Sequence, residues 1–229
     1  MKSDLPKVLH PVCGRPMIKI LLDTLAQLSP ARVVVVIGHK GEEVQAALGD
    51  YPVQFAWQRE QLGTGHAVMM AREAMTDFDG TTLVVAGDVP LLSVNSVNEL
   101  LKVHRETKAA GTCLSAVFAD PAGYGRIIRG SQPNQLLDII EHKDASDAIR
   151  QIDEVNSGTF CFDNQELFKV IDNLGNNNAQ REYYLTDVVK IFNRNGLRVS
   201  VTKASRPEEV LGVNSTEDLA TLESKLDNR

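Results

Sequence analysis

The run Val33-Val34-Val35-Val36-Ile37, closed by Gly38, constrains the fold of this chain more than any other feature. Every residue in it is apolar and β-branched, without the alternation of a strand that has one face in water. Such a run is typical of a parallel strand buried on both faces. Parallel strands need crossover connections, which are usually helices that cover the sheet. The run therefore predicts an α/β protein.

The segments around this run alternate as an α/β sheet requires. Strand-like stretches follow at Val53 to Trp57, Thr82 to Ala86 and Thr112 to Phe118, and helical spacing occurs at Ile18 to Leu28, Glu42 to Leu48, Gly65 to Met75 and Val94 to Lys108. This order predicts a Rossmann-like, doubly wound, mostly parallel sheet over residues 1–119.

The pattern changes after residue 119. A glycine-containing turn at 123–125 leads into strand-like stretches, which are Arg126 to Ile128, Leu136 to Glu141 and Thr159 to Phe162. These predict a small antiparallel substrate lobe over the edge of the sheet. Helices at 167–174 and 184–193, a strand at 198–202 and a closing helix at 216–226 complete one expected domain, with parts 1–119, 120–214 and 215–229.

The acidic balance of the chain excludes some classes of function. A net charge of −6 and the lack of any Lys/Arg run argue against a broad nucleic-acid surface. The longest apolar run is too short to span a bilayer, and polar residues rather than a leader follow Met1. Cys13, Cys113 and Cys161 lack metal or redox spacing, which fits reduced thiols in a cytoplasmic protein.

Three polar segments follow predicted strands. They are residues 58–66, Gly87-Asp88 and residues 123–125. Ligands of open α/β sheets bind beyond the carboxyl ends of the strands. We therefore expect the three segments to form one binding region.

Asp88 comes directly after a buried strand, where a carboxylate can hold Mg²⁺ against substrate phosphates. The alternative is that Asp88 only caps the following turn. Lys7 follows a proline in a predicted loop, where its charge could stabilise a phosphoryl-type transition state. The alternative for Lys7 is an ordinary solvated surface lysine.

Gln58 begins a segment that contains Gly63 and Gly65 and leads into a helix. A glutamine amide offers a donor and an acceptor to a pyrimidine edge. The glycines permit close backbone approach, and a helix start favours anions. A glycine-rich turn without a ligand is the alternative. Polar residues at Glu141 to Lys143 and Val155 to Gly158 could bind sugar hydroxyls or be ordinary loop polarity.

Taken together, these segments resemble the uridylyltransferase domain of bacterial bifunctional N-acetylglucosamine-1-phosphate uridylyltransferase / glucosamine-1-phosphate acetyltransferases, over essentially the whole chain. The motifs that carry the resemblance lie at residues 4–10, 61–67, 87–91, 123–127, 141–145, 156–158, 177–187 and 212–214. The segment Asn177 to Asp187 separates this branch from other sugar nucleotidyltransferases. The resemblance implies transfer of UMP from UTP to N-acetylglucosamine 1-phosphate, with UDP-N-acetylglucosamine and pyrophosphate as products, for cell-wall synthesis.

The resemblance also implies roles for individual residues. Asp88 and Asn214 would hold Mg²⁺, and Lys7 would stabilise charge at the α-phosphate. The nucleotide would contact residues of the first part of the chain, namely Gln58, Gln61, Gly63, Thr64, Ala86 and Gly87. The sugar would contact residues of the second part, namely Gly125, Glu141, Asn156, Tyr184 and Thr186.

The chain departs from the family pattern at its start. Met1 and Pro6-Lys7 match the second half of a nucleotide-binding signature, whose first half, an apolar strand and a glycine-rich loop, would precede Met1. Ala86 and Arg181 stand where some relatives have tyrosine and glycine. A β-helix acetyltransferase domain is also absent, so no acetyl transfer is expected.

Two alternatives to this enzyme stay open. The first is a truncated, catalytically impaired homologue that acts as a nucleotide-binding or protein-interaction module. The second is a related nucleotidyltransferase for another sugar or base. The sequence leaves homo-oligomerisation open as well, since an unpaired strand edge could recruit a second chain.

Overall fold

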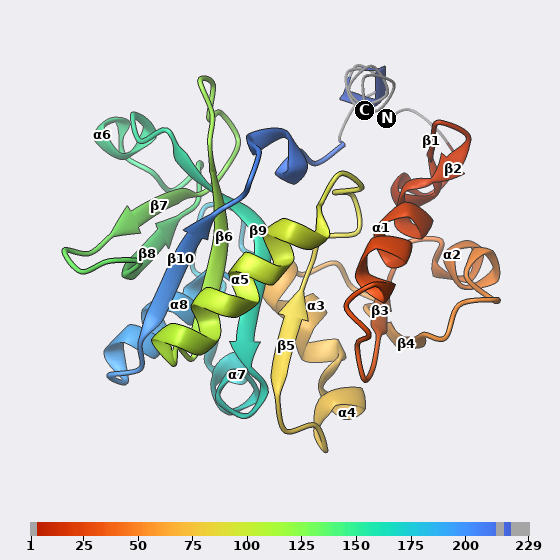
Figure 1. Cartoon of the computed structure of the whole chain (residues 1–229), viewed down its shortest axis with the longest axis horizontal. Coiled ribbons are helices and arrows are strands. Elements are labelled where there is room, and N and C mark those ends of the chain that lie inside the picture. The colour runs from red at the N-terminus through yellow and green to blue at the C-terminus, as the bar shows by residue number, and fades with distance from the viewer. Residues whose placement is uncertain (1–3, 214–217, 221–229) are drawn as a thin grey trace.

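The computed structural model describes residues 4–213 and 218–220. Its strands are β1 (Pro11–Val12), β2 (Arg15–Pro16), β3 (Val34–Ile37), β4 (Gln54–Trp57), β5 (Thr81–Val84), β6 (Gly111–Val117), β7 (Arg126–Arg129), β8 (Leu136–Ile140), β9 (Glu154–Asp163) and β10 (Val199–Lys203). They form a six-stranded sheet with the order β10-β6-β9-β7-β8, in which β5 also pairs with β9, and two separate pairs, β1-β2 and β3-β4 (Figure 1).

Helices connect most of these strands. The α-helices are α1 (Met17–Ala26), α2 (Gly41–Ala47), α3 (Thr64–Met70), α4 (Arg72–Met75), α5 (Val94–Thr107), α6 (Asp147–Arg150), α7 (Asn164–Val170) and α8 (Asp187–Arg194), and the 3₁₀ turns are η1 (Lys7–Leu9), η2 (Ile171–Asn173) and η3 (Pro207–Val210). The predicted closing helix at 216–226 lies outside the described residues except for 218–220, which are helical.

The α/β class predicted from the sequence is confirmed. Within this run, Val34–Ile37 form β3, which pairs in parallel with β4, and β6 pairs in parallel with β10. The expected burial of this strand on both faces is wrong, because only Ile37 is fully buried. The sheet is mixed, because β9 runs antiparallel to both of its long neighbours, β5 and β6. Strand β7 joins this sheet through β9 and pairs with β8 as an antiparallel hairpin.

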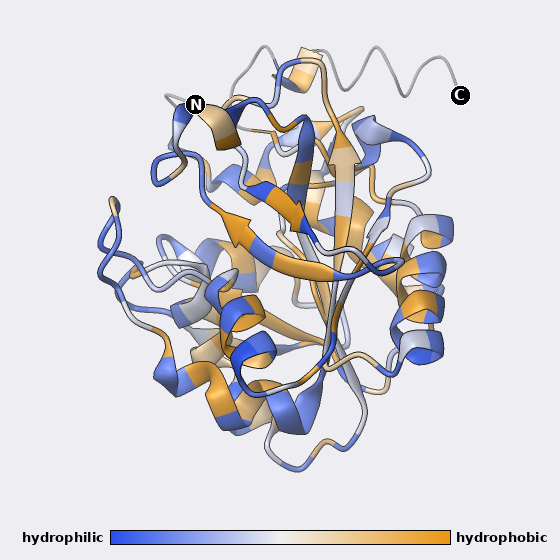
Figure 2. Cartoon of the chain, turned by 90° about the vertical axis from the view of Figure 1, so that its left-hand side faces the viewer, coloured by the Kyte–Doolittle hydropathy of each residue, from blue (hydrophilic) through white to orange (hydrophobic). Residues whose placement is uncertain are grey.

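Consecutive side chains of a strand point to opposite faces of the sheet, so the core lies in two layers, one on each face. Phe160 and Phe162 of β9 pack on one face with α7 and α8, whereas Cys161 packs on the other face with α5. Figure 1 shows α5 in front of β6 and β9 and α8 behind β10. In Figure 2 the strands are largely hydrophobic, and the helices carry hydrophobic and hydrophilic stretches in turn. Because both faces are covered, β6 is buried over nearly its whole length.

Strand β9 begins five residues earlier than the sequence pattern predicted, at Glu154 rather than Thr159. The polar segment 156–158 therefore lies inside the strand and not in a loop. Gly158 has a φ of +75°, and the pairing register with β6 shifts between Cys113 and Ser115. Next to this irregularity, the Asn156 backbone N–H donates to the carbonyl of Gly125, the residue before β7, at 2.9 Å.

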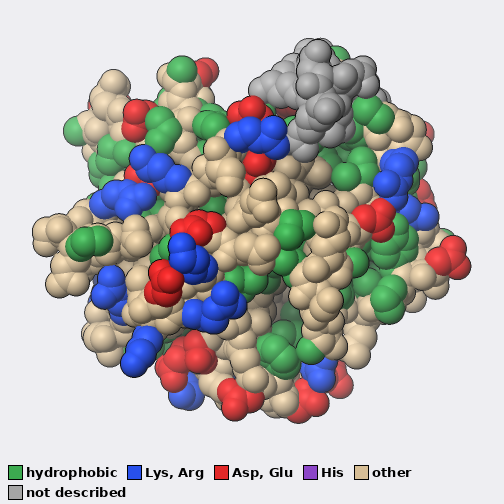
Figure 3. Space-filling view, viewed as in Figure 1, with side chains coloured by type: hydrophobic (Ala, Val, Ile, Leu, Met, Phe, Trp, Pro, Cys, Tyr) green, Lys and Arg blue, Asp and Glu red, His purple; other side chains and the backbone are tan. Residues whose placement is uncertain are grey.

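Two further properties bear on function. No helix among residues 4–213 and 218–220 is long and apolar enough to cross a membrane. On the face drawn in Figure 3, basic and acidic side chains are interspersed.

A half-buried ion pair ties β7 to β9. The Arg129 guanidinium donates to both carboxylate oxygens of Glu154, at 2.7 and 2.6 Å, and the Ser115 hydroxyl donates to the same carboxylate. Burial by itself would raise the pKa of Glu154, but the bonds from Arg129 and Ser115 hold that pKa below its ordinary value. The pair therefore stabilises the fold above the pKa of an unfolded glutamate, and this contribution is lost as pH falls through the folded-state pKa.

We expect Arg129→Leu to lower the free energy of unfolding by about 3 kcal/mol, because it leaves a buried carboxylate without its cation. The double variant Arg129→Leu/Glu154→Leu should recover most of that loss, since no charge is then stranded. Urea unfolding of the three proteins at neutral pH measures both effects. Equal losses in the single and double variants would contradict this account.

Candidate functional site

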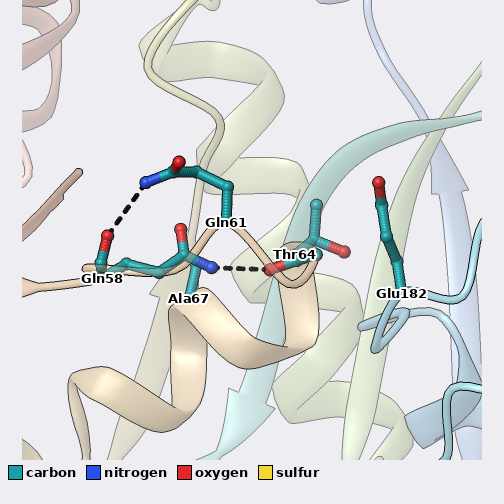
Figure 4. A pocket seen from close by; sticks show the side chains of 6 residues that line it. Gln58, Gln61, Thr64, Ala67 and Glu182 are labelled. Carbon is teal, nitrogen blue, oxygen red and sulfur yellow. Dashed lines mark hydrogen bonds between the residues drawn. The ribbon is translucent and has the colours of Figure 1, made fainter. Parts of the chain in front are cut away.

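An open cavity of about 260 Å³ lies where β4 ends and α3 begins. Its lining residues come from the 58–67 segment and from one distant position, and are Gln58, Gln61, Gly63, Thr64, Ala67 and Glu182. In Figure 4, Gln58 extends from the strand end, Thr64 and Ala67 lie on α3, and Glu182 faces them from a separate segment. The four residues that the sequence assigned to this part of a nucleotide site thus surround one cavity.

Backbone pairing joins this loop to residues 182–186. The Tyr183 N–H donates to the Leu62 carbonyl at 2.8 Å, and the Gly65 N–H donates to the Tyr183 carbonyl at 2.7 Å. The Leu185 N–H completes the contact by donating to the Thr64 hydroxyl oxygen at 3.1 Å. The first residues of α3 are therefore held against a segment 121 residues away in the chain.

Gly63 is required at the centre of this junction. Its φ of +110° and ψ of 176° define a conformation that is essentially restricted to glycine. A Cβ at this position would lie 2.7 Å from the Tyr183 carbonyl oxygen. The sequence signal for Gly63 was its Gly-x-Gly pattern, and the structure supplies the steric reason.

Lys7 and Asp88 lie next to each other, although 81 residues separate them. The Lys7 ammonium forms an ion pair with the Asp88 carboxylate. Asp88 and the preceding Ala86 and Gly87 follow β5, and a Cβ on Gly87 would lie 3.2 Å from Val8 in η1. The close approach permitted by Gly87 therefore brings η1, with Lys7, to the end of β5.

The carboxylate of Asp88 has the donor chemistry that Mg²⁺ prefers, a hard oxygen at a strand end. The Val213 N–H donates to the Asp88 carbonyl at 3.1 Å, which brings the chain up to residue 213 beside Asp88. Asn214, the other predicted metal ligand, lies outside the described residues. Among residues 4–213 and 218–220, no group of three or more His, Cys, Asp or Glu side chains is arranged to hold a metal ion.

The residues predicted to bind a sugar converge on Glu141. The Thr186 hydroxyl donates to Glu141 Oε1 at 3.0 Å. A Cβ on Gly125 would lie 3.2 Å from both carboxylate oxygens, so glycine lets the backbone approach them. Asn156 is joined to Gly125 by the backbone hydrogen bond described above, and its side-chain oxygen accepts from the Gly158 N–H at 2.9 Å. The sugar-binding roles of these residues stay predictions.

A second cavity, of about 180 Å³, lies beside Glu141. Tyr184 lines it, and the Tyr184 hydroxyl donates to Asp144 at 3.3 Å and accepts from the Gln180 amide at 3.0 Å. Asp187 and Lys190 at the start of α8 line it as well. Segment 182–186 contributes to both cavities, because Glu182 lines the first and Tyr184 the second.

Tyr124 brings the glycine turn at 123–125 to the hydrophobic cluster that contains Val89, the residue after Asp88. Burial raises the pKa of the Tyr124 phenol, and a hydrogen bond with the Gly212 backbone lowers it. The charges of Asp218 and Asp88 raise it as well.

Sequence reasoning did not single out several residues that line the cavities. Asp144 and Asp187 lie within segments that carry the family resemblance, but their charges gave no local sign of a role. Glu182 lies within such a segment too, whereas Lys190 lies outside them, and both residues line a cavity. The contact between Asp144 and Tyr184 spans 40 residues, so no local pattern encodes it.

Known proteins of similar sequence confirm the family resemblance. A family profile described as the MobA-like NTP transferase domain matches residues 1–157. The bifunctional protein GlmU of Geobacillus sp. (strain WCH70) is 48% identical to the chain over 229 residues, and that of Bacillus subtilis (strain 168) is 45% identical. Both alignments cover 100% of this chain and 50% of the relative, so the chain spans about half the length of the curated relatives it matches.

We expect Gly63→Ala to destabilise the protein by about 3 kcal/mol, because alanine strains the backbone at this φ and its methyl group meets the Tyr183 carbonyl. Gly175→Ala is the matched control, since a Cβ there meets nothing within 4 Å. Denaturant unfolding gives the two free energies. Equal small effects in both variants would contradict the required conformation of Gly63.

Thr186→Val should raise the pKa of Glu141. Burial already raises this pKa, and the Thr186 hydrogen bond opposes the rise by favouring the ionised carboxylate. Because the folded-state pKa exceeds the unfolded one, the Glu141 carboxyl lowers stability as pH rises through that window, and Thr186→Val should widen the window.

Carbon-13 NMR titration of the glutamate carboxyls, assigned with Glu141→Gln, measures this pKa directly. Thr76→Val serves as the control, since the Thr76 hydroxyl donates to its own helix at the Arg72 carbonyl. A Glu141 pKa that is the same in Thr186→Val and the unmodified protein would show that the hydrogen bond has no electrostatic effect.

Proposed function

The chain belongs to the family of MobA-like NTP transferase domains, and from that premise we propose that it transfers UMP from UTP to N-acetylglucosamine 1-phosphate. The products are UDP-N-acetylglucosamine, a cell-wall precursor, and pyrophosphate. The observation that carries the proposal is the Lys7–Asp88 ion pair at the end of β5, in a chain that also has a cavity at the loop from Gln58 to Ala67 and a polar cluster at Glu141. A charged pair, a base-sized cavity and a polar cluster are what a nucleotide triphosphate and a sugar phosphate require.

The reaction is an in-line displacement at phosphorus. A phosphate oxygen of the sugar phosphate forms a bond to the α-phosphorus of UTP, and the bond from that phosphorus to the bridging oxygen of pyrophosphate breaks. Pyrophosphate leaves with the electron pair of that bond. The attacking phosphate is already ionised near neutral pH, so no general base is needed. Catalysis then comes from positioning and from stabilisation of charge.

Lys7 would place its ammonium on the α-phosphate oxygens as charge redistributes there. Asp88, with Asn214, would hold Mg²⁺, which when bound neutralises phosphate charge. Gly87 would keep the backbone at the end of β5 close to the nucleotide, and the neighbouring Ala86 would contribute only backbone atoms.

The two cavities would take the two ends of the substrates. Gln58, Gln61, Gly63 and Thr64 would seat the uridine. The carboxylate of Glu141 would accept hydrogen bonds from sugar hydroxyls, next to Gly125 and Asn156, with Tyr184 and Thr186 near the N-acetyl group. The acidic surroundings of the second cavity suit a hydroxyl-rich, neutral ring better than a second phosphate.

We place the reaction in the cytoplasm. Cys13, Cys113 and Cys161 are all free thiols, and Cys113 and Cys161 are buried in the core. Free thiols are typical of proteins that work in a reducing compartment.

Pyrophosphate release from UTP and N-acetylglucosamine 1-phosphate in the presence of Mg²⁺ tests the proposal. We expect turnover by this chain, and losses in kcat of about 100-fold or more for Asp88→Asn and Lys7→Met, the size seen when one group that stabilises transition-state charge is removed. Asp50→Asn and Lys102→Met are the controls, since both side chains are exposed and line neither cavity. The controls should keep full activity.

Other outcomes separate the alternatives. A folded chain that binds UTP but releases no pyrophosphate would favour a nucleotide-binding module over an enzyme. Faster turnover with another nucleotide triphosphate or another sugar phosphate would overturn the assigned substrates and keep the nucleotidyl transfer.

A further inference from the structure

We propose that His66 is a positioning residue that sets which nucleotide base the first cavity accepts. This inference rests on the proposed function, because it concerns the base of the nucleotide. His66 lies on α3, half-buried behind the cavity, with its ring centroid 6.3 Å from that of Tyr183. Its contact with Gln58 is what gives it a role.

The Gln58 amide nitrogen has two partners within the loop. It lies 3.0 Å from the Gly63 carbonyl oxygen and 3.1 Å from His66 Nδ1. The orientation of a glutamine amide has to be assigned from its partners. A carbonyl oxygen only accepts, so the atom that faces Gly63 must be the nitrogen. The opposite orientation would bring two acceptor oxygens together.

This orientation also fixes the tautomer of His66. The second amide hydrogen of Gln58 points to Nδ1, so Nδ1 must accept it and the imidazole proton must sit on Nε2. Both hydrogens of the Gln58 amide are then used inside the protein. The side chain keeps one group for a ligand, the acceptor oxygen Oε1.

The rest of Gln58 is held firmly enough for this assignment to matter. Its backbone N–H donates to the Ile37 carbonyl at 2.8 Å, and its carbonyl accepts from the Gln61 amide at 3.1 Å. A Cβ on Gly38 would lie 2.9 Å from that carbonyl, so the turn after β3 is packed against it. The backbone of Gln58 is therefore held in place, and the contacts with Gly63 and His66 orient its amide.

When Gln58 offers a ligand only its acceptor oxygen, it favours a base that presents an N–H to that oxygen. Uracil does so through its imide N3–H, whereas cytosine has an acceptor nitrogen at that position. If His66 could not accept, the second Gln58 hydrogen would be free to donate to a ligand. Gln58 would then offer both a donor and an acceptor, and discrimination between the two bases would weaken.

Equilibrium binding of UTP and CTP to the whole chain tests this role without requiring turnover. We expect His66→Phe, which keeps a ring but cannot accept, to reduce the preference for UTP over CTP by about five- to tenfold, the effect of about one hydrogen bond. His66→Asn, which is smaller but supplies an acceptor oxygen, should keep the preference. A residue that only fills space would give the reverse order, and that result would overturn the proposal.

Nitrogen-15 NMR of the histidine rings gives an independent measurement. At a pH where the imidazole is neutral, we expect the Nδ1 of His66 to be unprotonated and its Nε2 to carry the proton. A protonated Nδ1 would overturn the proposal whatever the nucleotide affinities. Failure of the unmodified protein to bind either nucleotide would instead contradict the proposed function, so the two failures are distinguishable.

Discussion

The backbone pairing between residues 62–65 and 183–185 is the interaction on which the arrangement of the site depends. It joins the loop at the first cavity to the segment that leads into α8 and lines the second cavity. Two of its hydrogen bonds join backbone groups of the two segments, and one joins a backbone N–H to a threonine hydroxyl. The geometry of these bonds is therefore set by the path of the chain, and it tolerates little displacement of one segment against the other. Gly63 and Gly65 permit that path because any side chain on either would meet Tyr183. The relative position of the two cavities follows from this junction.

The same region contains carboxylates whose partial burial lowers the stability of the fold. Glu141 is a half-buried carboxylate whose pKa is raised by burial, and burial also raises the pKa of the half-buried Asp187. The ion pair of the sheet, Arg129 with Glu154, lies elsewhere. Carboxylates that are partly buried beside a cavity and only partly compensated are typical of groups kept for binding. The core on both faces of β6 and β9 supplies the stability that offsets them.

The sequence predicted the elements whose pattern is local. The β-branched run became β3, and the helical spacing of 94–108 became α5, which ends one residue earlier. It did not predict the start of β9, because Asn156, Ser157 and Gly158 look like a loop when read alone. Their strand conformation comes from pairing with β6, a long-range effect that overrides propensity. The sequence also predicted that β5 belongs to a parallel sheet. Its partner is instead the antiparallel β9.

For the site, the sequence identified residue types and the structure identified their partners. A glutamine after a strand suggested an amide with both a donor and an acceptor to offer, but Gly63 and His66 use both of its hydrogens. Lys7 and Asp88 likewise satisfy each other in this structure, and both are partly exposed. Breaking the pair costs the attraction between two partly desolvated charges. In the proposed function, the triphosphate would bring negative charge to Lys7 and Mg²⁺ would bring positive charge to Asp88, so both members of the pair would gain new partners together. Under that proposal, the pair would favour a ligand that arrives as a metal–phosphate complex over either component alone.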